Sequence, residues 1–282
     1  MYPLTLKIFQ INPASFFTVS FILLILSFSP KGTAETFSFT VQPILSPEKT
    51  RALYKPLTDY LSQHTGHTFN VVAERNFLSY WYKMKKGKYD LIFDAAHFTD
   101  FRINHLDYTI LAKVPDTVSF SLITSSKNLI LDHSELVGKT LATQPPPSIG
   151  AANLQKLYPS PTRQPVIVTM KSADEAIKAV QSGKYYAALV PTPLLNNKEG
   201  LHIIKTTEPV PHMAVSASGK IDKALQARIQ NALVNAKNSH TGQVLLEKLG
   251  LSAFNETTAQ TYKGYEKYLA GMIRTSRLGT TR

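Results

Sequence analysis

The sequence predicts an α/β protein of two similar lobes with a crevice between them. Two stretches, 76–94 and 172–190, carry one pattern 96 positions apart: an apolar helix face, a glycine followed by Lys-Tyr, and a short apolar run. Apolar residues at i, i+3, i+4 and i+7 mark a buried helix face, and the short run is typical of a buried parallel strand. Because ligands bind at the carboxyl ends of such strands, we expect a binding site between the lobes.

Each repeat ends its helix at a glycine, Gly87 in the first stretch and Gly183 in the second. Glycine takes the left-handed backbone conformation at little cost and therefore stops a helix. A helix–glycine–strand unit that occurs twice favours two α/β lobes over one continuous sheet.

The other elements follow from the same patterns of apolar spacing, caps and breakers. Expected strands lie at 37–41, 69–72, 89–93, 108–112, 118–123, 165–169, 186–190 and 203–204, with a helical turn leading into a strand within 134–142. Expected helices lie at 47–65, 76–86, 98–105, 149–157, 172–182, 220–237, 240–248 and 257–273.

The chain is expected to cross between the lobes near 113–118 and again near 207–214. Lobe 1 then comprises residues 35–115 together with 209–282, and lobe 2 comprises residues 116–208.

The N-terminal residues 1–34 have the pattern of a secretory signal peptide. Lys7 precedes an uncharged stretch with a dense apolar core at 16–26, and small residues follow at 32–34. We expect cleavage after Ala34 and a periplasmic location, because the core is short for a bilayer span. An uncleaved anchor helix remains the alternative.

Composition narrows the class of protein further. The chain has no cysteine, which excludes a lipoprotein anchor, disulfides, thiolate metal sites and cysteine nucleophiles. An exported protein of this size without disulfides suits a bacterial periplasm. The formal charge of +12 becomes +10 without Lys7 and Lys31, which favours anionic ligands, acidic partners or an anionic membrane surface.

Sequence signatures of catalysis and of nucleic-acid binding are absent. The chain has no nucleophile elbow, no His-Glu-x-x-His motif, no phosphate loop and no recognisable nucleic-acid-binding motif. We therefore expect a non-enzyme with no cofactor, no bound metal and no nucleic-acid partner. Metal binding by His97, or by His212 with Met213, remains open.

Several motifs resemble one known family. They are Tyr-Lys-Pro-Leu-Thr-Asp-Tyr-Leu at 54–61 with Gly66, Gly-Lys-Tyr-Asp at 87–90, Leu-Val-Gly-Lys at 136–139, and Ala-Ile-Lys-Ala-Val at 176–180. Over essentially the whole mature chain, the sequence resembles the phosphate/phosphite/phosphonate-binding family of periplasmic proteins (PhnD-like), partners of ABC importers. The resemblance implies a type II periplasmic binding protein fold, with two Rossmann-like lobes joined by two crossovers.

The resemblance also implies a monomeric solute-binding protein that serves an ABC permease. A periplasmic sensor that docks on a membrane receptor, or a metal-handling protein on the same scaffold, is the alternative.

The chain departs from the family at the ligand loops. The family's Ser-Thr-Ser-Gly loop is Pro-Ser-Ile-Gly here, at 147–150. The family's histidine falls near Ser172 or Ala173, and its later aspartate becomes Tyr186. The family's Gly-Pro after the third strand becomes Ala95-Ala96, followed by His97. Each lost partner would leave a phosphonate oxygen unpaired, at about 1–3 kcal/mol. The resemblance therefore implies the fold and the binding role, but not phosphonate as the ligand.

Candidate ligand-binding residues lie at the expected strand ends and helix starts, where helix N-termini favour anions. They are Ser46, Asp94, Ala95, His97, Ser148, Ile149, Gly150 and Thr192. For Ser46 the alternative is a role limited to capping its own helix, and for Asp94 and His97 it is a polar loop without ligand. We expect the ligand to be a small anion or zwitterion.

Overall fold

The structure is a computed structural model that describes residues 34–270, so the expected signal peptide lies outside it except for Ala34. The described chain contains two five-stranded sheets with the same strand pattern. In each sheet, three parallel strands are followed by two strands that each run antiparallel to their neighbour. We call each sheet with its helices a lobe.

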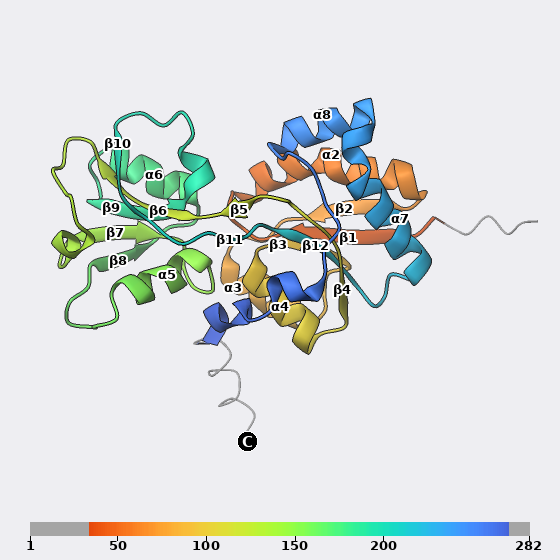
Figure 1. The fold of residues 1–282 in the computed structure, drawn as a ribbon, viewed down its shortest axis with the longest axis horizontal. Coiled ribbons are helices and arrows are strands. Elements are labelled where there is room, and N and C mark those ends of the chain that lie inside the picture. Colours follow the sequence, from red (N-terminus) through yellow and green to blue (C-terminus); the bar gives the residue numbers. More distant parts are fainter. Residues whose placement is uncertain (1–33, 271–282) are drawn as a thin grey trace, which may run out of the picture. The chain divides into compact units, whose positions relative to one another are not determined.

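The first lobe is built on a sheet of strand order β2-β1-β3-β12-β4. Its strands are β1 (Thr36–Val41), β2 (Thr68–Val72), β3 (Leu91–Asp94), β4 (Tyr108–Lys113) and β12 (Ala214–Ser218). Three helices lie on one face and two on the other (Figure 1). They are α2 (Pro47–Thr65), α7 (Lys223–Val234) and α8 (His240–Leu249), and then α3 (Phe77–Lys85) and α4 (Ala96–His105).

The second lobe is built on a sheet of strand order β10-β6-β9-β7-β8. Its strands are β6 (Phe120–Ser125), β7 (Thr140–Thr143), β8 (Val166–Thr169), β9 (Ala187–Pro191) and β10 (Leu201–Thr206). One helix covers each face, α6 (Ala173–Gln181) and α5 (Ile149–Leu157) (Figure 1). Short 3-10 turns complete the chain: η1 (His133–Leu136), η2 (Thr192–Leu195), η3 (Ala236–Asn238), η4 (Ala259–Tyr262) and η5 (Tyr265–Leu269).

The two lobes are connected by two short strands that pair with each other. β5 (Thr117–Val118) follows β4, and β11 (Val210–Pro211) precedes β12. They form an antiparallel two-stranded sheet. The two connections between the sheets therefore run side by side, in the manner of a double crossover.

The repeated unit is confirmed in detail. Helices α3 and α6 each have nine residues, and their first residues are 96 positions apart. Gly87 and Gly183 follow them with left-handed φ angles of 60° and 75°. The apolar face of α3 is fully packed, with Tyr80 and Trp81 at most 2% exposed, so both residues belong to the core as expected.

One expected element is wrong. The sequence predicted a helix over 257–273, but the described part of this stretch contains only the 3-10 turns η4 and η5. Gly264 separates them with a left-handed φ of 87°, which a continuous helix does not allow. In residues 34–270, no helix combines the length and the apolar character needed to cross a membrane.

Candidate functional site

A small cavity lies between the lobes at the carboxyl ends of their parallel strands. It measures about 20 Å³, room for about one water molecule. The first lobe contributes Gln42, Ile44, Phe77, Ala95 and His97. The second lobe contributes Gln144, Ser148, Ile149, Pro191 and Phe120.

Three side chains form hydrogen bonds between the lobes, two of them beside this cavity. Nε2 of His97 lies 2.9 Å from the carbonyl oxygen of Pro147. Nε2 of Gln144 donates to the carbonyl oxygens of Pro43 at 3.1 Å and Ile44 at 3.4 Å. At the surface, Nζ of Lys49 donates to Asp174 at 2.8 Å.

Two loops with the same motif face each other across the cleft. Gln-Pro-Ile-Leu-Ser at 42–46 follows β1, and Gln-Pro-Pro-Pro-Ser at 144–148 follows β7, 102 positions later. Each loop ends in the serine that caps the next helix. The sequence analysis missed Gln42 and Gln144 as lining residues, although this repeated Gln-Pro-x-x-Ser motif was the signal that marks them.

Two helix starts meet at the cavity. The N-cap residue of α4 is Ala95, which provides no side-chain cap. The N-cap residue of α5 is Ser148, whose Oγ accepts from the backbone N–H of Ala151 at 3.2 Å and donates to the carbonyl oxygen of Gln144 at 2.9 Å. The first N–H groups of a helix have no partner within it. The amides that open α4 and α5 therefore give the cavity positive character from both lobes.

His97 is neutral in this site. It is 1% exposed, and burial lowers its pKa to about 4, although the Pro147 carbonyl and the Asp94 carboxylate act in the opposite direction. The site thus holds a polar but uncharged imidazole.

Asp94 lies behind the cavity in a buried ion pair. Its carboxylate oxygens accept from Nη1 and Nη2 of Arg102 at 2.5 and 2.6 Å, and from Oγ1 of Thr99 at 3.1 Å. Tyr80 donates its hydroxyl to the same carboxylate. Burial opposes the charge on Arg102, but Asp94 and Tyr80 outweigh it and raise the arginine's pKa. Asp94 therefore ties the end of β3 to α4 and does not line the cavity.

The cavity collects four of the eight predicted residues, Ala95, His97, Ser148 and Ile149. Ser46 caps α2 by accepting from the N–H of Lys49. Gly150 lies against β7, where an added Cβ would come within 3.0 Å of Oγ1 of Thr143. Thr192 bonds to the hydroxyls of Ser119 and Ser121, at 2.9 Å each.

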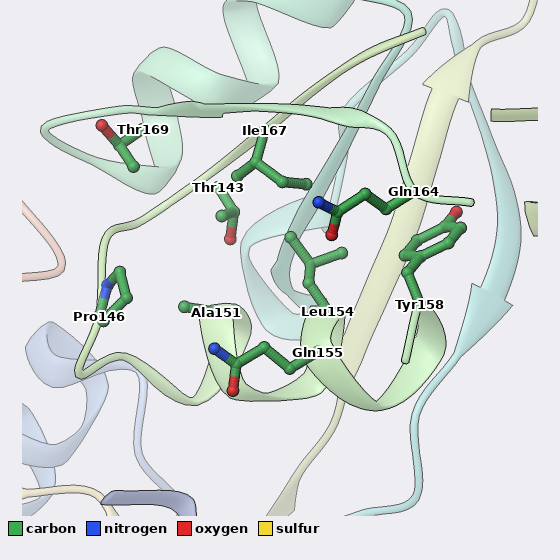
Figure 2. Close-up of a pocket in the computed structure, with 9 residues that line it drawn as sticks. All are labelled: Thr143, Pro146, Ala151, Leu154, Gln155, Tyr158, Gln164, Ile167 and Thr169. Carbon is green, nitrogen blue, oxygen red and sulfur yellow. The ribbon is translucent and has the colours of Figure 1, made fainter. Parts of the chain in front are cut away.

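A larger cavity of about 180 Å³ lies wholly within the second lobe, between α5 and strands β7 and β8 (Figure 2). Leu154 and Ile167 lie in it together with the amides of Gln155 and Gln164 (Figure 2). Its nine lining residues include no charged side chain and none of the predicted site residues. A further hollow of about 240 Å³ lies between α5 and Tyr268 of η5, and Ser148 lines it as well.

Metal ligands do not gather in the described chain: within residues 34–270 no group of three or more His, Cys, Asp or Glu side chains is placed to hold an ion. Nδ1 of His212 accepts from the N–H of Met213 at 2.8 Å.

Comparison with solved structures shows the same fold. The protein PhnD1 from Prochlorococcus marinus in complex with methylphosphonate is 12% identical, with a TM-score of 0.73 over 85% of this chain and 98% of its own. A binding protein of an ABC phosphonate transporter from Pseudomonas aeruginosa is 13% identical, with a TM-score of 0.74 over 88% and 90%. XAC2383 from Xanthomonas citri bound to chloride is 14% identical, with a TM-score of 0.70 over 86% and 99%.

These similarities confirm the two-lobe type II periplasmic binding protein fold. A search of curated proteins found no match. The sequence itself matches one protein family over residues 39–262, which confirms the resemblance and the solute-binding role. The chain belongs to the family of periplasmic substrate-binding proteins of ABC phosphonate transporters.

Proposed function

We propose that this protein captures a small anionic or zwitterionic solute between its lobes and delivers it to an ABC permease. The observation that carries the proposal is the meeting of two helix starts, at Ala95 and Ser148, on one inter-lobe cavity. Unpaired amides and the helix dipole favour negative charge at such a place. Methylphosphonate and chloride, named with two proteins of the same fold, are both anions.

The roles of the candidate residues differ in this proposal. Direct contact falls to Ala95, His97, Ser148 and Ile149, which line the cavity with Gln42 and Gln144. Supporting roles fall to Asp94, which anchors α4, and to Ser46, Gly150 and Thr192, which hold the neighbouring loops.

We propose lobe boundaries at 35–115 with 209–282 and at 116–208, which agree with the strands of each sheet. Residues 1–34 would be the signal peptide that directs a monomeric protein to the periplasm, the location that the family implies.

Binding also requires motion in this proposal. A cavity with room for about one water molecule is too small for a phosphonate. The lobes must therefore separate to admit the solute and then close on it. The paired crossovers β5 and β11 are the natural hinge. A smaller radius of gyration with saturating solute, measured by X-ray scattering, would support this closure, and an unchanged radius would count against it.

The test removes one helix-start donor. Proline is well tolerated at the first helical position, and α2 already has Pro47 there. Ile149→Pro therefore deletes one N–H beside the cavity, and Ser148 already has the extended backbone that precedes proline. Ile149→Ala controls for the lost side chain, and Ala173→Pro makes the same change at α6, outside the cavity.

Titration calorimetry with methylphosphonate, phosphate, acetate and glycine gives the readout. We expect Ile149→Pro to bind about tenfold more weakly than Ile149→Ala, the scale of a hydrogen bond to a charged group. Ala173→Pro should bind like the unchanged protein. If none of the four solutes binds, or if both proline variants behave alike, the proposed site is wrong.

A further inference from the structure

His97 has a fixed tautomer. Its Nε2 lies 2.9 Å from the carbonyl oxygen of Pro147, and a carbonyl oxygen only accepts. Nε2 therefore carries the hydrogen. Because burial keeps the ring neutral, it has only this one N–H. Nδ1 is therefore an unprotonated acceptor with a lone pair.

That acceptor has no partner in the described chain. In residues 34–270 no group bonds to Nδ1 of His97, and the residue is 1% exposed. Nearby donors are committed elsewhere: the Ser148 hydroxyl to the carbonyl oxygen of Gln144, and the Gln144 amide to that of Pro43. Buried polar atoms are almost always paired in native proteins, so each exception requires an explanation.

A fully ionised anion does not satisfy this atom. Its oxygens are acceptors, and two acceptors facing each other in a buried site repel. A group with an O–H or N–H does satisfy Nδ1, while its negative oxygens take the amides of α4 and α5. His97 lines the same cavity as the starts of α4 and α5, so a solute bound there lies beside its ring.

We infer that the bound solute presents a hydrogen-bond donor, an O–H or N–H group, to Nδ1 of His97, and that this contact disfavours donor-free anions of the same shape. The inference rests on the proposed solute site and names His97 as the residue that determines specificity. Pro147, from the opposite lobe, holds the tautomer, so the acceptor is set correctly only while the lobes are in contact.

Two pairs of similar solutes test the two kinds of donor, a P–O–H group and an N–H group. At slightly acidic pH, methylphosphonate is mainly a monoanion that keeps one P–O–H, whereas methanesulfonate has the same shape and charge without it. Above neutral pH, where the P–O–H is lost, aminomethylphosphonate keeps an N–H donor that ethylphosphonate lacks. We expect at least one pair to show a preference of about tenfold for the donor-bearing solute.

Two variants tie the preference to His97. In His97→Gln, the amide nitrogen takes the place of Nε2 and the acceptor at Nδ1 is removed, so the preference should fall to nearly one. In His97→Asn, the amide oxygen stands near the place of Nδ1, so part of the preference should remain. Nitrogen-15 shifts of the imidazole in the full chain should show Nδ1 unprotonated and hydrogen-bonded in the solute-bound protein.

The outcomes are distinct. Equal binding within both pairs, a preference that His97→Gln keeps, or a proton on Nδ1 of the solute-bound protein overturns this inference and leaves the solute site standing. Absence of binding by all four probes overturns this inference, and absence of binding by phosphate, acetate and glycine as well overturns the proposed function together with it.

Discussion

The two copies of the helix–strand unit share a backbone but differ in what they bury. In the first copy, Tyr80 of α3 faces Asp94 at the end of β3. The equivalent positions of the second copy, 96 residues later, are Ala176 and Val190, and both are buried. A polar pair in one lobe is thus an apolar pair in the other.

The difference follows from the element that comes next. β3 leads into α4, which brings Arg102 back to Asp94. β9 leads instead into the short turn η2, which begins Thr192-Pro193 and supplies no such cation. A buried carboxylate is sustained only where a charged partner reaches it. The comparison indicates that the ion pair has a role only in the first lobe, where it anchors α4 to the end of β3.

The largest effect should come from breaking that ion pair. Asp94→Asn leaves the Arg102 charge buried without its partner, which costs about 3–5 kcal/mol of unfolding free energy. Val190→Ala, at the equivalent place in the second lobe, only removes two methyl groups and should cost less. Urea unfolding of both variants measures the difference.

A double variant sharpens this comparison. Replacing Asp94 by Asn together with Arg102 by Met removes both charges, so most of the lost stability should return. If the single and double variants are equally unstable, the charges themselves are not the cause and the packing of α4 is.

The next largest effect should be a pH dependence of stability that comes from the first lobe alone. His97 titrates, whereas the equivalent residue of the second lobe, Pro193, does not. The folded pKa of His97, about 4, lies below its ordinary value of 6.5. Between these values the unfolded chain binds more protons, so the unfolding free energy falls as pH drops from 6.5 to 4 and is unaffected by this residue above 6.5. We expect the unchanged protein to lose roughly 3 kcal/mol more than His97→Gln over this window. Parallel pH profiles of the two proteins would contradict this assignment.

Local pattern predicted the repeated helices because apolar spacing and a terminal glycine act within a few residues. It did not predict β12, whose sequence Ala-Val-Ser-Ala-Ser consists mostly of small residues, and which lies in the sheet between β3 and β4. Nor did it predict the break at Gly264, where the apolar spacing outweighed the glycine.

The residues of the candidate site also fall into those that the sequence predicted and those that it missed. The rule that ligands meet strand ends led to Ala95 and Ser148 directly. Phe77 and Phe120 come to the cavity only through the packing of whole elements. Arg102 was missed because arginine is normally solvent-exposed, and only the buried carboxylate of Asp94 makes its burial tolerable.

A smaller effect distinguishes the two Gln-Pro-x-x-Ser loops. Gln144 donates across the cleft to Pro43, whereas Gln42 accepts from the N–H of Ala95 within its own lobe. Gln42→Ala removes one hydrogen bond and should cost about 1 kcal/mol of stability, and Gln144→Ala removes the bonds to Pro43 and Ile44 and should cost at least as much. Of these two variants, only Gln144→Ala should also raise the radius of gyration of the solute-free protein, because Gln144 bonds to the opposite lobe and Gln42 does not. Equal radii for the two variants would show that the glutamine contact does not hold the cleft together.

The smallest effect should come from the surface bond between Lys49 and Asp174. It joins α2 of one lobe to α6 of the other, but Lys49 is well exposed, and its pKa is raised by the hydrogen bond to Asp174 and by that residue's charge. Such pairs contribute little and weaken further with salt. Lys55→Met is the matched control, because Lys55 pairs with Asp59 inside α2 and bridges nothing. We expect added sodium chloride to raise the radius of gyration slightly in the unchanged protein and in Lys55→Met, but not in Lys49→Met, where the bond is already lost. A salt response that persists in Lys49→Met would place the salt-sensitive contact between the lobes elsewhere.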